Sequence, residues 1–151
     1  MKPTPKDWPR ISSSLFYTQP AKAIDWLCQA FGFEVRLKVE GDGDAIIHSE
    51  LTFGDGLVMV SGSAAVSPTK GDRDYMKSPG DVGGGNTQCL FIYVDDVEAH
   101  CSRARAAGAV IVKEPATTDY GDDYWIDRGY NARDLEGHHW YFAQRLRGAK
   151  T

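Results

Sequence analysis

The residues best suited to chemistry lie in two stretches that are far apart in the sequence. His48 and Glu50 are separated by one residue, so in a strand they project from the same face. A carboxylate beside an imidazole can tune proton transfer near neutral pH, and it can equally form a plain hydrogen-bonded pair on a half-exposed sheet. We treat Glu50 and His48 as candidate catalytic residues, with the structural interpretation kept open beside them.

The second stretch is residues 133–142 near the end of the sequence, which predict a hairpin. Gly137 supplies the positive φ angle that a tight turn needs. Beyond it, alternation places Trp140 and Phe142 on one face, as core residues, and leaves His139 and Tyr141 on the other. His139 and Tyr141 are therefore candidate ligand-binding residues.

The strand expected over residues 45–53 shows the same alternation. Its apolar residues predict one face against a helix, which leaves His48 and Glu50 facing a cleft. Two imidazoles and a carboxylate from His48, Glu50 and His139 would be a chemically sensible metal set. Nothing in their spacing shows that the three groups meet, so this set is only an alternative.

The elements that must position these residues form two similar halves. In residues 11–62 we expect a strand, a helix that begins near Pro20 and ends at Gly32, and three strands. In residues 88–144 we expect a strand, a helix that ends at Gly108, and three strands, with a loop over residues 114–125. The terminating glycines are 108 − 32 = 76 residues apart. Such a repeat predicts two βαβββ modules.

Residues 63–87 differ from both halves. They are rich in Ser, Gly and Pro and show no period, so we interpret them as a linker that could cover a site. The triple glycine at residues 83–85 lacks the Lys and Ser/Thr that a phosphate-binding loop requires.

Composition narrows the class of protein. The 151 residues carry a net charge of -4 with scattered Lys and Arg, which argues against nucleic acid as a partner. No apolar run has the length of a membrane span, and the start of the chain does not resemble a signal peptide, so we expect a cytoplasmic protein. The three cysteines, at positions 28, 89 and 101, show no zinc-site spacing. The basic residues after position 144 are interpreted as a solvated tail.

The two halves resemble the vicinal oxygen chelate superfamily, which includes glyoxalase I, bleomycin-resistance proteins and extradiol dioxygenases. The resemblance is carried by residues 23–27 (AIDWL), 30–33 (AFGF), 94–97 (VDDV), 105–109 (RAAGA) and 133–140 (RDLEGHHW). It implies an α+β fold in which two βαβββ modules form a curved mixed sheet with a cleft. It specifies activity poorly, because this superfamily spans lyases, dioxygenases, epimerases and binding proteins.

The resemblance also implies where metal ligands would lie. In metal-dependent members they come from the first and last strands of each module, and the matching positions here are Ser12, Val60, Cys89 and Tyr141. Serine, valine and tyrosine make a poor metal set even with a cysteine beside them. We therefore expect no cofactor, although a divalent metal would be needed in the alternative with a shifted site.

The leading hypothesis is a protein, expected to be a homodimer, that binds a small organic molecule in its cleft without the family metal. The first alternative is a metal-dependent enzyme similar to lactoylglutathione lyase or to a dioxygenase, with Glu50 as its base. The second is a structural or partner-binding domain. Neither a membrane nor a nucleic acid is an expected partner. The predicted ligand-binding residues are Ser12, Ser14, Phe16, Val58, Val60, Cys89, Phe91, Trp125, His139 and Tyr141.

Overall fold

The computed structural model describes residues 1–63 and 74–150 and confirms the α+β fold with two βαβββ halves. The first half contains β1 (Ser13–Phe16), α1 (Pro20–Phe31), β2 (Glu34–Glu40), β3 (Ile46–Phe53) and β4 (Gly56–Ser61). The second half contains β5 (Leu90–Tyr93), α2 (Val97–Ala106), β6 (Val110–Asp119), β7 (Ile126–Arg133) and β8 (His139–Arg147). Between them lies a short 3-10 helix, η2 (Pro79–Val82). Residues 64–73 of the expected linker lie outside the described residues.

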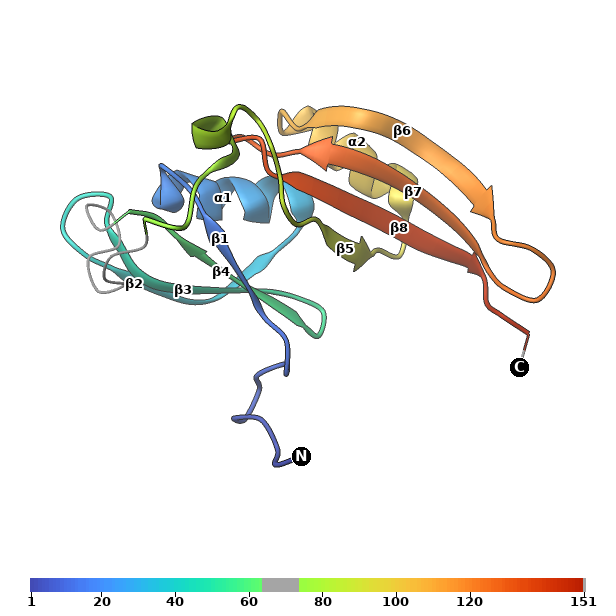
Figure 1. Cartoon of the computed structure of the whole chain (residues 1–151), viewed down its shortest axis with the longest axis horizontal. Coiled ribbons are helices and arrows are strands. Elements are labelled where there is room, and N and C mark those ends of the chain that lie inside the picture. Colours follow the sequence, from blue (N-terminus) through green and yellow to red (C-terminus); the bar gives the residue numbers. More distant parts are fainter. Residues whose placement is uncertain (64–73, 151) are drawn as a thin grey trace.

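Each half forms its own four-stranded mixed sheet. The strand order is β1-β4-β3-β2 in the first sheet and β5-β8-β7-β6 in the second. The pairs β1–β4 and β5–β8 are parallel, and all the others are antiparallel. Figure 1 shows α1 over one side of the first sheet and α2 over one side of the second. We call the side of each sheet that carries no helix its open face.

The sequence of α1 accounts for both of its ends. Pro20 occupies the first turn, and Ile24, Leu27 and Phe31 form a stripe that is completely buried. Gly32 ends the helix with a φ of 83°, in the left-handed region that favours glycine. No helix in the described part of the chain is long and apolar enough to cross a membrane.

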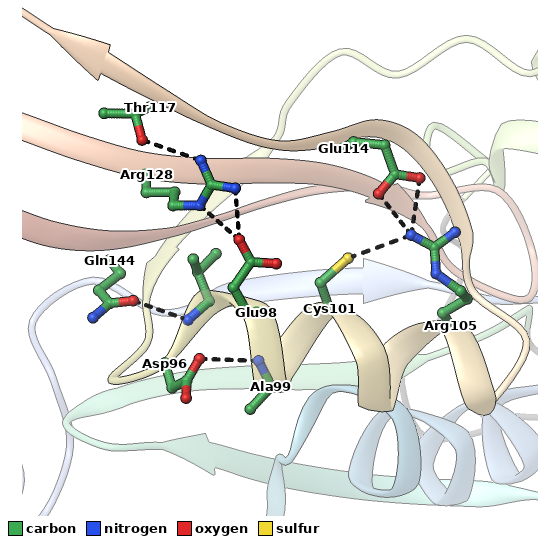
Figure 2. A network of polar contacts seen from close by, with 10 residues as sticks. Asp96, Glu98, Ala99, Cys101, Arg105, Glu114, Thr117, Arg128 and Gln144 are labelled. Carbon is green, nitrogen blue, oxygen red and sulfur yellow. Dashed lines mark hydrogen bonds and ion pairs between the residues drawn. The ribbon is translucent and has the colours of Figure 1, made fainter.

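The helix α2 has a thinner apolar stripe, made by Val97, Cys101 and Ala104. Polar contacts, shown in Figure 2, supplement it. The side chain of Asp96 caps the helix by accepting from the backbone N–H of Ala99 at 3.0 Å. The side-chain oxygen of Gln144, on β8, accepts from the first N–H of the helix at 3.2 Å.

Two ion pairs also join α2 to its sheet (Figure 2). Arg128 of β7 pairs with Glu98 at 2.6 Å, and Arg105 pairs with Glu114 of β6 at 2.6 Å. Because both pairs are largely exposed, each adds little to the free energy of folding. They add contacts from the helix to β6 and β7.

A single hydrophobic core joins the two halves. Phe31, at the end of α1, packs on the rings of Trp140 and Phe142 of β8, with centroids 5.3 and 4.8 Å away. The indole N–H of Trp26 donates to the backbone carbonyl of Ala107 in the second half at 2.8 Å. The modules are therefore packed as one unit and share aromatic side chains that are removed from water.

The carboxylate of Asp134 lies at the same junction and is only 5% exposed. It accepts a hydrogen bond from the Tyr17 hydroxyl at 2.6 Å and from the Trp140 indole N–H at 3.0 Å. It also accepts from the backbone N–H groups of Glu136 and His138, at 3.0 and 2.9 Å. One side chain thus fixes the β7–β8 turn, orients β8 and binds the first half.

The β7–β8 turn reaches the first half through two further side chains. The Glu136 carboxylate accepts from the backbone N–H groups of Thr18 and Gln19, at 2.7 and 2.9 Å, where α1 begins. The His138 ring donates from Nε2 to the backbone carbonyl of Phe16 at 2.8 Å. The turn therefore holds the segment that leads into a helix of the other module.

Two predicted boundaries were wrong. The strand β6 runs on to Asp119, although residues 114–125 were expected to be a loop. Pro115 is tolerated because β6 is an edge strand and its register shifts between Lys113 and Ala116. The strand β8 continues to Arg147, so Arg145 and Arg147, which were expected in a solvated tail, belong to the sheet.

Removing the Asp134 carboxylate should be strongly destabilising. We expect Asp134→Ala to lower the free energy of unfolding by about 3 kcal/mol, because four donors would lose their acceptor in a buried place. Tyr17→Phe, which removes one of them, should cost about 1–2 kcal/mol. Urea denaturation measures both, with the exposed Asp123→Ala as control. Equal effects of Asp134→Ala and Asp123→Ala would contradict this account.

His100 makes the junction sensitive to acid. Its Nδ1 bonds the Tyr130 hydroxyl at 2.7 Å and its Nε2 the Phe31 carbonyl at 2.9 Å. Burial lowers the pKa of His100 below the ordinary 6.5, and Arg103 lowers it further, against the opposing hydrogen bond to Phe31. The unfolded chain therefore takes up this proton first as the pH falls.

The part of the stability that is linked to His100 should therefore be fully present above pH 6.5. It should be lost as the pH falls below 6.5 toward the pKa of His100 in the folded protein. His100→Gln should reduce this acid-linked loss, measured as the urea midpoint between about pH 7 and 5. The control His139→Gln should retain it, because His100 is still present. An identical pH dependence in His100→Gln and the wild type would refute the assignment.

Candidate functional site

The open face of the second sheet is built by alternation along β5 and β8. Trp140 and Phe142 are 1% and 0% exposed, which confirms them as core residues, and Tyr141 therefore points to the open face. In the parallel register, Phe91 lies beside Tyr141 and Tyr93 beside Ala143. The open face thus receives aromatic side chains from two neighbouring strands.

Four aromatic side chains form what we call the aromatic platform: Phe91, Tyr93, Trp125 and Tyr141. The ring of Phe91 lies 4.7 Å from that of Tyr141 and 5.1 Å from that of Tyr93, between centroids. Phe91 is 54% exposed and Tyr93 48% exposed. Large aromatic side chains therefore meet solvent here side by side, rather than singly.

Arg145 links Trp125 to the rest of the platform. Its guanidinium carbon lies 5.1 Å from the centre of the Tyr93 ring and 5.0 Å from that of Trp125. The guanidinium pairs with Asp127, which is 4% exposed, and donates to the Tyr93 hydroxyl. The Tyr93 hydroxyl donates to Asp127 Oδ2 at 3.2 Å. The positive charge of Arg145 is therefore largely balanced by the buried carboxylate of Asp127.

The platform and the charged pair beside it include residues that sequence reasoning missed. Arg145 was assigned to a solvated tail, and that prediction was wrong because β8 extends beyond it. Asp127 and Tyr93 were not singled out. Continuing the alternation from Trp140 would have placed Arg145 on the face of Tyr141, but its pairing with Asp127 depends on the β7–β8 register.

The tyrosine hydroxyls of the platform stay protonated at neutral pH. Burial is the main cause that raises the pKa of Tyr141, and Tyr120, Asp127 and Tyr93 raise it further. Burial and Asp127 also raise the pKa of Tyr93, with an opposing effect of Arg145. The Tyr141 hydroxyl makes no hydrogen bond to any other residue within the described ranges. It can therefore donate to a bound molecule.

The open face of the first sheet carries charges instead of aromatic rings. The Glu50 carboxylate, 6% exposed, bonds His48 Nε2 and Arg36 Nε, each at 2.8 Å. Burial alone would raise the pKa of Glu50, but the hydrogen bonds from His48 and Arg36 lower it below its ordinary value. The Arg36 guanidinium in turn lies 5.1 Å from the Trp8 ring.

The structure thus brings His48 and Glu50 together, as their spacing predicted, and adds Arg36. A carboxylate with a lowered pKa binds a proton less readily, so this environment weakens Glu50 as a general base. His139 does not complete a metal set with them. Within residues 1–63 and 74–150, no group of three or more His, Cys, Asp and Glu side chains could hold a metal ion.

Three predicted ligand-binding residues have positions that differ from the expected cleft wall. Val60 is 1% exposed and lies in the core, because β4 pairs Leu51 with Val58 and so turns both valines toward the helices. Val58 is 5% exposed, yet it lines a hollow of about 600 Å³ that also includes Phe91. Cys89 lies just before β5 and is exposed as a residue. Partial burial of its thiol nevertheless raises the pKa of Cys89, which disfavours the thiolate.

Another pocket, of about 440 Å³, lies where β1 meets the start of β8 and residues 75–88. It is lined by Ser14, Phe16 and His139, so three predicted residues meet there. Ser12 lies outside it, and its buried Oγ has no hydrogen-bond partner in the described chain. The predicted residues are therefore divided among two pockets and two open faces rather than gathered in one cleft.

Comparison with known proteins places this geometry in a family. A family model described as the Glyoxalase/Bleomycin resistance protein/Dioxygenase superfamily matches residues 11–142. The chain belongs to this superfamily.

Similar proteins extend over nearly the whole length of this superfamily member. An uncharacterized protein of Mycobacterium bovis is 30% identical over 146 residues, covering 92% of this chain and 85% of the relative. The crystal structure of TioX from Micromonospora sp. ML1 is 34% identical with a TM-score of 0.67, covering 91% of this chain and 99% of TioX. A family enzyme from Burkholderia phytofirmans PsJN, 18% identical, has a TM-score of 0.65 over 89% of this chain and 97% of its own, and shows the fold alone.

The pairing on the first sheet predicts a selective change in one pKa. Arg36→Met should raise the pKa of Glu50, because the carboxylate would lose a hydrogen bond and a nearby positive charge. Lys38→Met is a matched control, since Lys38 on the same strand pairs with Glu40 at 2.8 Å. Carbon-13 NMR of the glutamate side chains measures both. A Glu50 titration that responds equally to the two variants would contradict the pairing.

Proposed function

We propose that this protein binds a small planar organic molecule on the aromatic platform, without the metal ion used by metal-dependent members of its superfamily. The observation that carries the proposal is the contiguous exposure of Phe91 and Tyr93 beside Tyr141 on one sheet face. Flat rings offer stacking area and lose little conformational entropy on binding. Exposure of such a surface to water is unfavourable unless something covers it.

In metal-dependent members of the superfamily the ligands come from the first and last strands of each module. The side chains on these strands here support a metal-free proposal. On the open faces, β1 and β4 pair Ser14 with Met59, and β5 and β8 pair Phe91 with Tyr141. None of these side chains is an imidazole, a carboxylate or a thiolate, which are the donors that common protein metals prefer. His139, at the start of β8, is the imidazole closest to this set in sequence. The donor set does not fit the family metal.

The polar groups of the platform indicate the chemistry of the ligand. The free Tyr141 hydroxyl can donate to a carbonyl, hydroxyl or ring nitrogen of the ligand. Because the carboxylate of Asp127 balances the charge of Arg145, the platform does not strongly favour a charged ligand of either sign. We therefore favour a planar molecule with hydrogen-bond acceptors at its edge. Sequestration of such a compound by a homodimer would be a function of the kind that bleomycin-resistance proteins perform.

A second candidate function is catalysis on the first sheet. The observation that favours it is the pair of His48 and Glu50, 2.8 Å apart on an open face. A lyase, isomerase or dioxygenase with a shifted metal site would need these residues close to His139. Glu50→Gln would then abolish turnover while the fold is retained. Retained turnover in Glu50→Gln would remove Glu50 from the catalytic role.

The binding proposal can be tested with two planar fluorescent probes of opposite charge, proflavine and anthracene-2-carboxylate. We expect saturable binding of at least one of them, and about tenfold weaker binding by Phe91→Ala and Tyr141→Ala. Tyr75→Ala is the matched control, because Tyr75 is 81% exposed and lines the pocket beside β1 instead. Fluorescence titration gives the dissociation constants.

The same titrations decide between the alternatives. Failure of both probes to bind would contradict the proposal and favour a structural or partner-binding domain. Loss of binding in Tyr75→Ala alone would move the site to the pocket beside β1. Binding should be unchanged by EDTA, and a large stoichiometric rise of the melting temperature with one divalent metal would contradict the metal-free proposal.

A further inference from the structure

Gly129 lies at the centre of the second sheet, on its open face and directly beneath Tyr141. A Cβ atom added to Gly129 would lie 2.5 Å from the Tyr141 hydroxyl oxygen and 2.8 Å from the ring carbon that carries it. Both separations are shorter than real Cβ atoms show to any neighbour. The Tyr141 ring therefore extends from β8 across β7 and occupies the space that any other side chain at position 129 would fill.

Two more small residues lie beside Gly129 on the same face, and we call the three together the floor of the platform. Across the sheet, Gly129 pairs with Ala116 of β6 on one side and with Ala143 of β8 on the other. Ala143 is completely buried although the register places it on the open face. The floor lets a ring lie flat on the sheet rather than stand upright from it.

We propose that Gly129 is a positioning residue for ligand binding: it holds the Tyr141 ring flat across β7, so that the ring and the ring of Phe91 form one stacking surface. This inference rests on the proposed function, because its purpose is to shape the aromatic platform. It assigns a binding role to a residue that touches no ligand itself.

The backbone conformation at position 129 does not require a glycine. Its φ angle is outside the positive region, so the conformation is open to any residue. Glycine is otherwise unfavourable in the interior of a strand, since it loses the most conformational entropy and packs no side chain. The close approach of another group is one reason for a glycine at such a place, and the nearest group to position 129 is a side chain. Here that side chain is Tyr141.

The environment of Tyr141 agrees with a ring held against the sheet. Its centroid lies 4.7 Å from that of Phe91, and the two ring planes differ by 35°. Burial raises the pKa of its hydroxyl, together with the nearby Asp127 and Tyr93. A ring that left the floor would lose contact with these groups and titrate closer to its ordinary value.

The test is a double-mutant cycle of Gly129→Ala and Tyr141→Ala, with Gly148→Ala as matched control. Gly148 has no atom within 4 Å of an added Cβ and an ordinary φ. Affinity for proflavine and anthracene-2-carboxylate is measured by fluorescence. In parallel, carbon-13 NMR of tyrosine labelled at the ring carbon Cζ follows the resonance and titration of Tyr141. The two readings separate the position of the ring from the binding of a ligand.

We expect Gly129→Ala to weaken binding about tenfold, as Tyr141→Ala does, and the double variant to be no weaker than Tyr141→Ala. The Tyr141 resonance should move and its titration should shift toward an ordinary tyrosine, whereas Gly148→Ala should change neither reading.

Three results would overturn the inference in distinguishable ways. If the two losses multiply in the double variant, Gly129 acts through the Phe142 carbonyl, which lies 3.0 Å from the added Cβ, and not through Tyr141. An unchanged Tyr141 resonance in Gly129→Ala would refute the positioning itself. If the wild type binds neither probe, the proposed function fails and the binding role of Gly129 fails with it, even where the NMR shows a displaced ring.

Discussion

The buried carboxylate of Asp134 connects the two halves of the chain, and the candidate site depends on it. Its acceptors fix Tyr17 of the first half and Trp140 of the second, together with the backbone of the turn between β7 and β8. A hydrogen bond to a buried charged group stabilises more than one between neutral groups. If the acceptor is lost, the buried donors have neither a protein partner nor a water molecule to bond. Because Trp140 is held in the core, the next residue, Tyr141, must face outward.

This arrangement gives the two open faces different chemistry. The second sheet presents aromatic rings beside Arg145, whose charge is balanced by Asp127, so flat and weakly charged molecules fit it best. The first sheet presents Glu50 between Arg36 and His48, with its charge already satisfied. A satisfied carboxylate with a lowered pKa suits the positioning of neighbours more than proton abstraction. The aromatic face is therefore the stronger candidate for ligand binding.

Much of the fold could be predicted from the sequence, because its signals are local. The stripe of Ile24, Leu27 and Phe31 defines α1, and glycine at position 32 ends it. The alternation after Gly137 correctly separated Trp140 and Phe142 from Tyr141. These predictions required only the period of a helix or strand and the conformational preference of glycine.

The parts that were missed depend on pairing between strands. The face of Val60 follows from the register of β3 and β4, in which Leu51 meets Val58. Matching Val60 to a ligand position of the superfamily had placed it toward the cleft instead. The pair of Arg145 and Asp127 requires the β7–β8 register across 18 residues. Gly129 carries no signal in a single sequence, because its reason is a ring that arrives from another strand. Local patterns therefore predicted the scaffold, and tertiary contacts decided the site.

The central claim is that a planar molecule binds the aromatic platform without a metal. A crystal soaked with a brominated planar carboxylate, such as a bromo derivative of anthracene-2-carboxylate, tests it most directly through the anomalous signal of bromine. The account predicts a bromine peak next to the rings of Phe91 and Tyr141 and an X-ray fluorescence spectrum without a metal edge. A peak beside His48 and Glu50, or a bound metal that contacts the ligand, would contradict it.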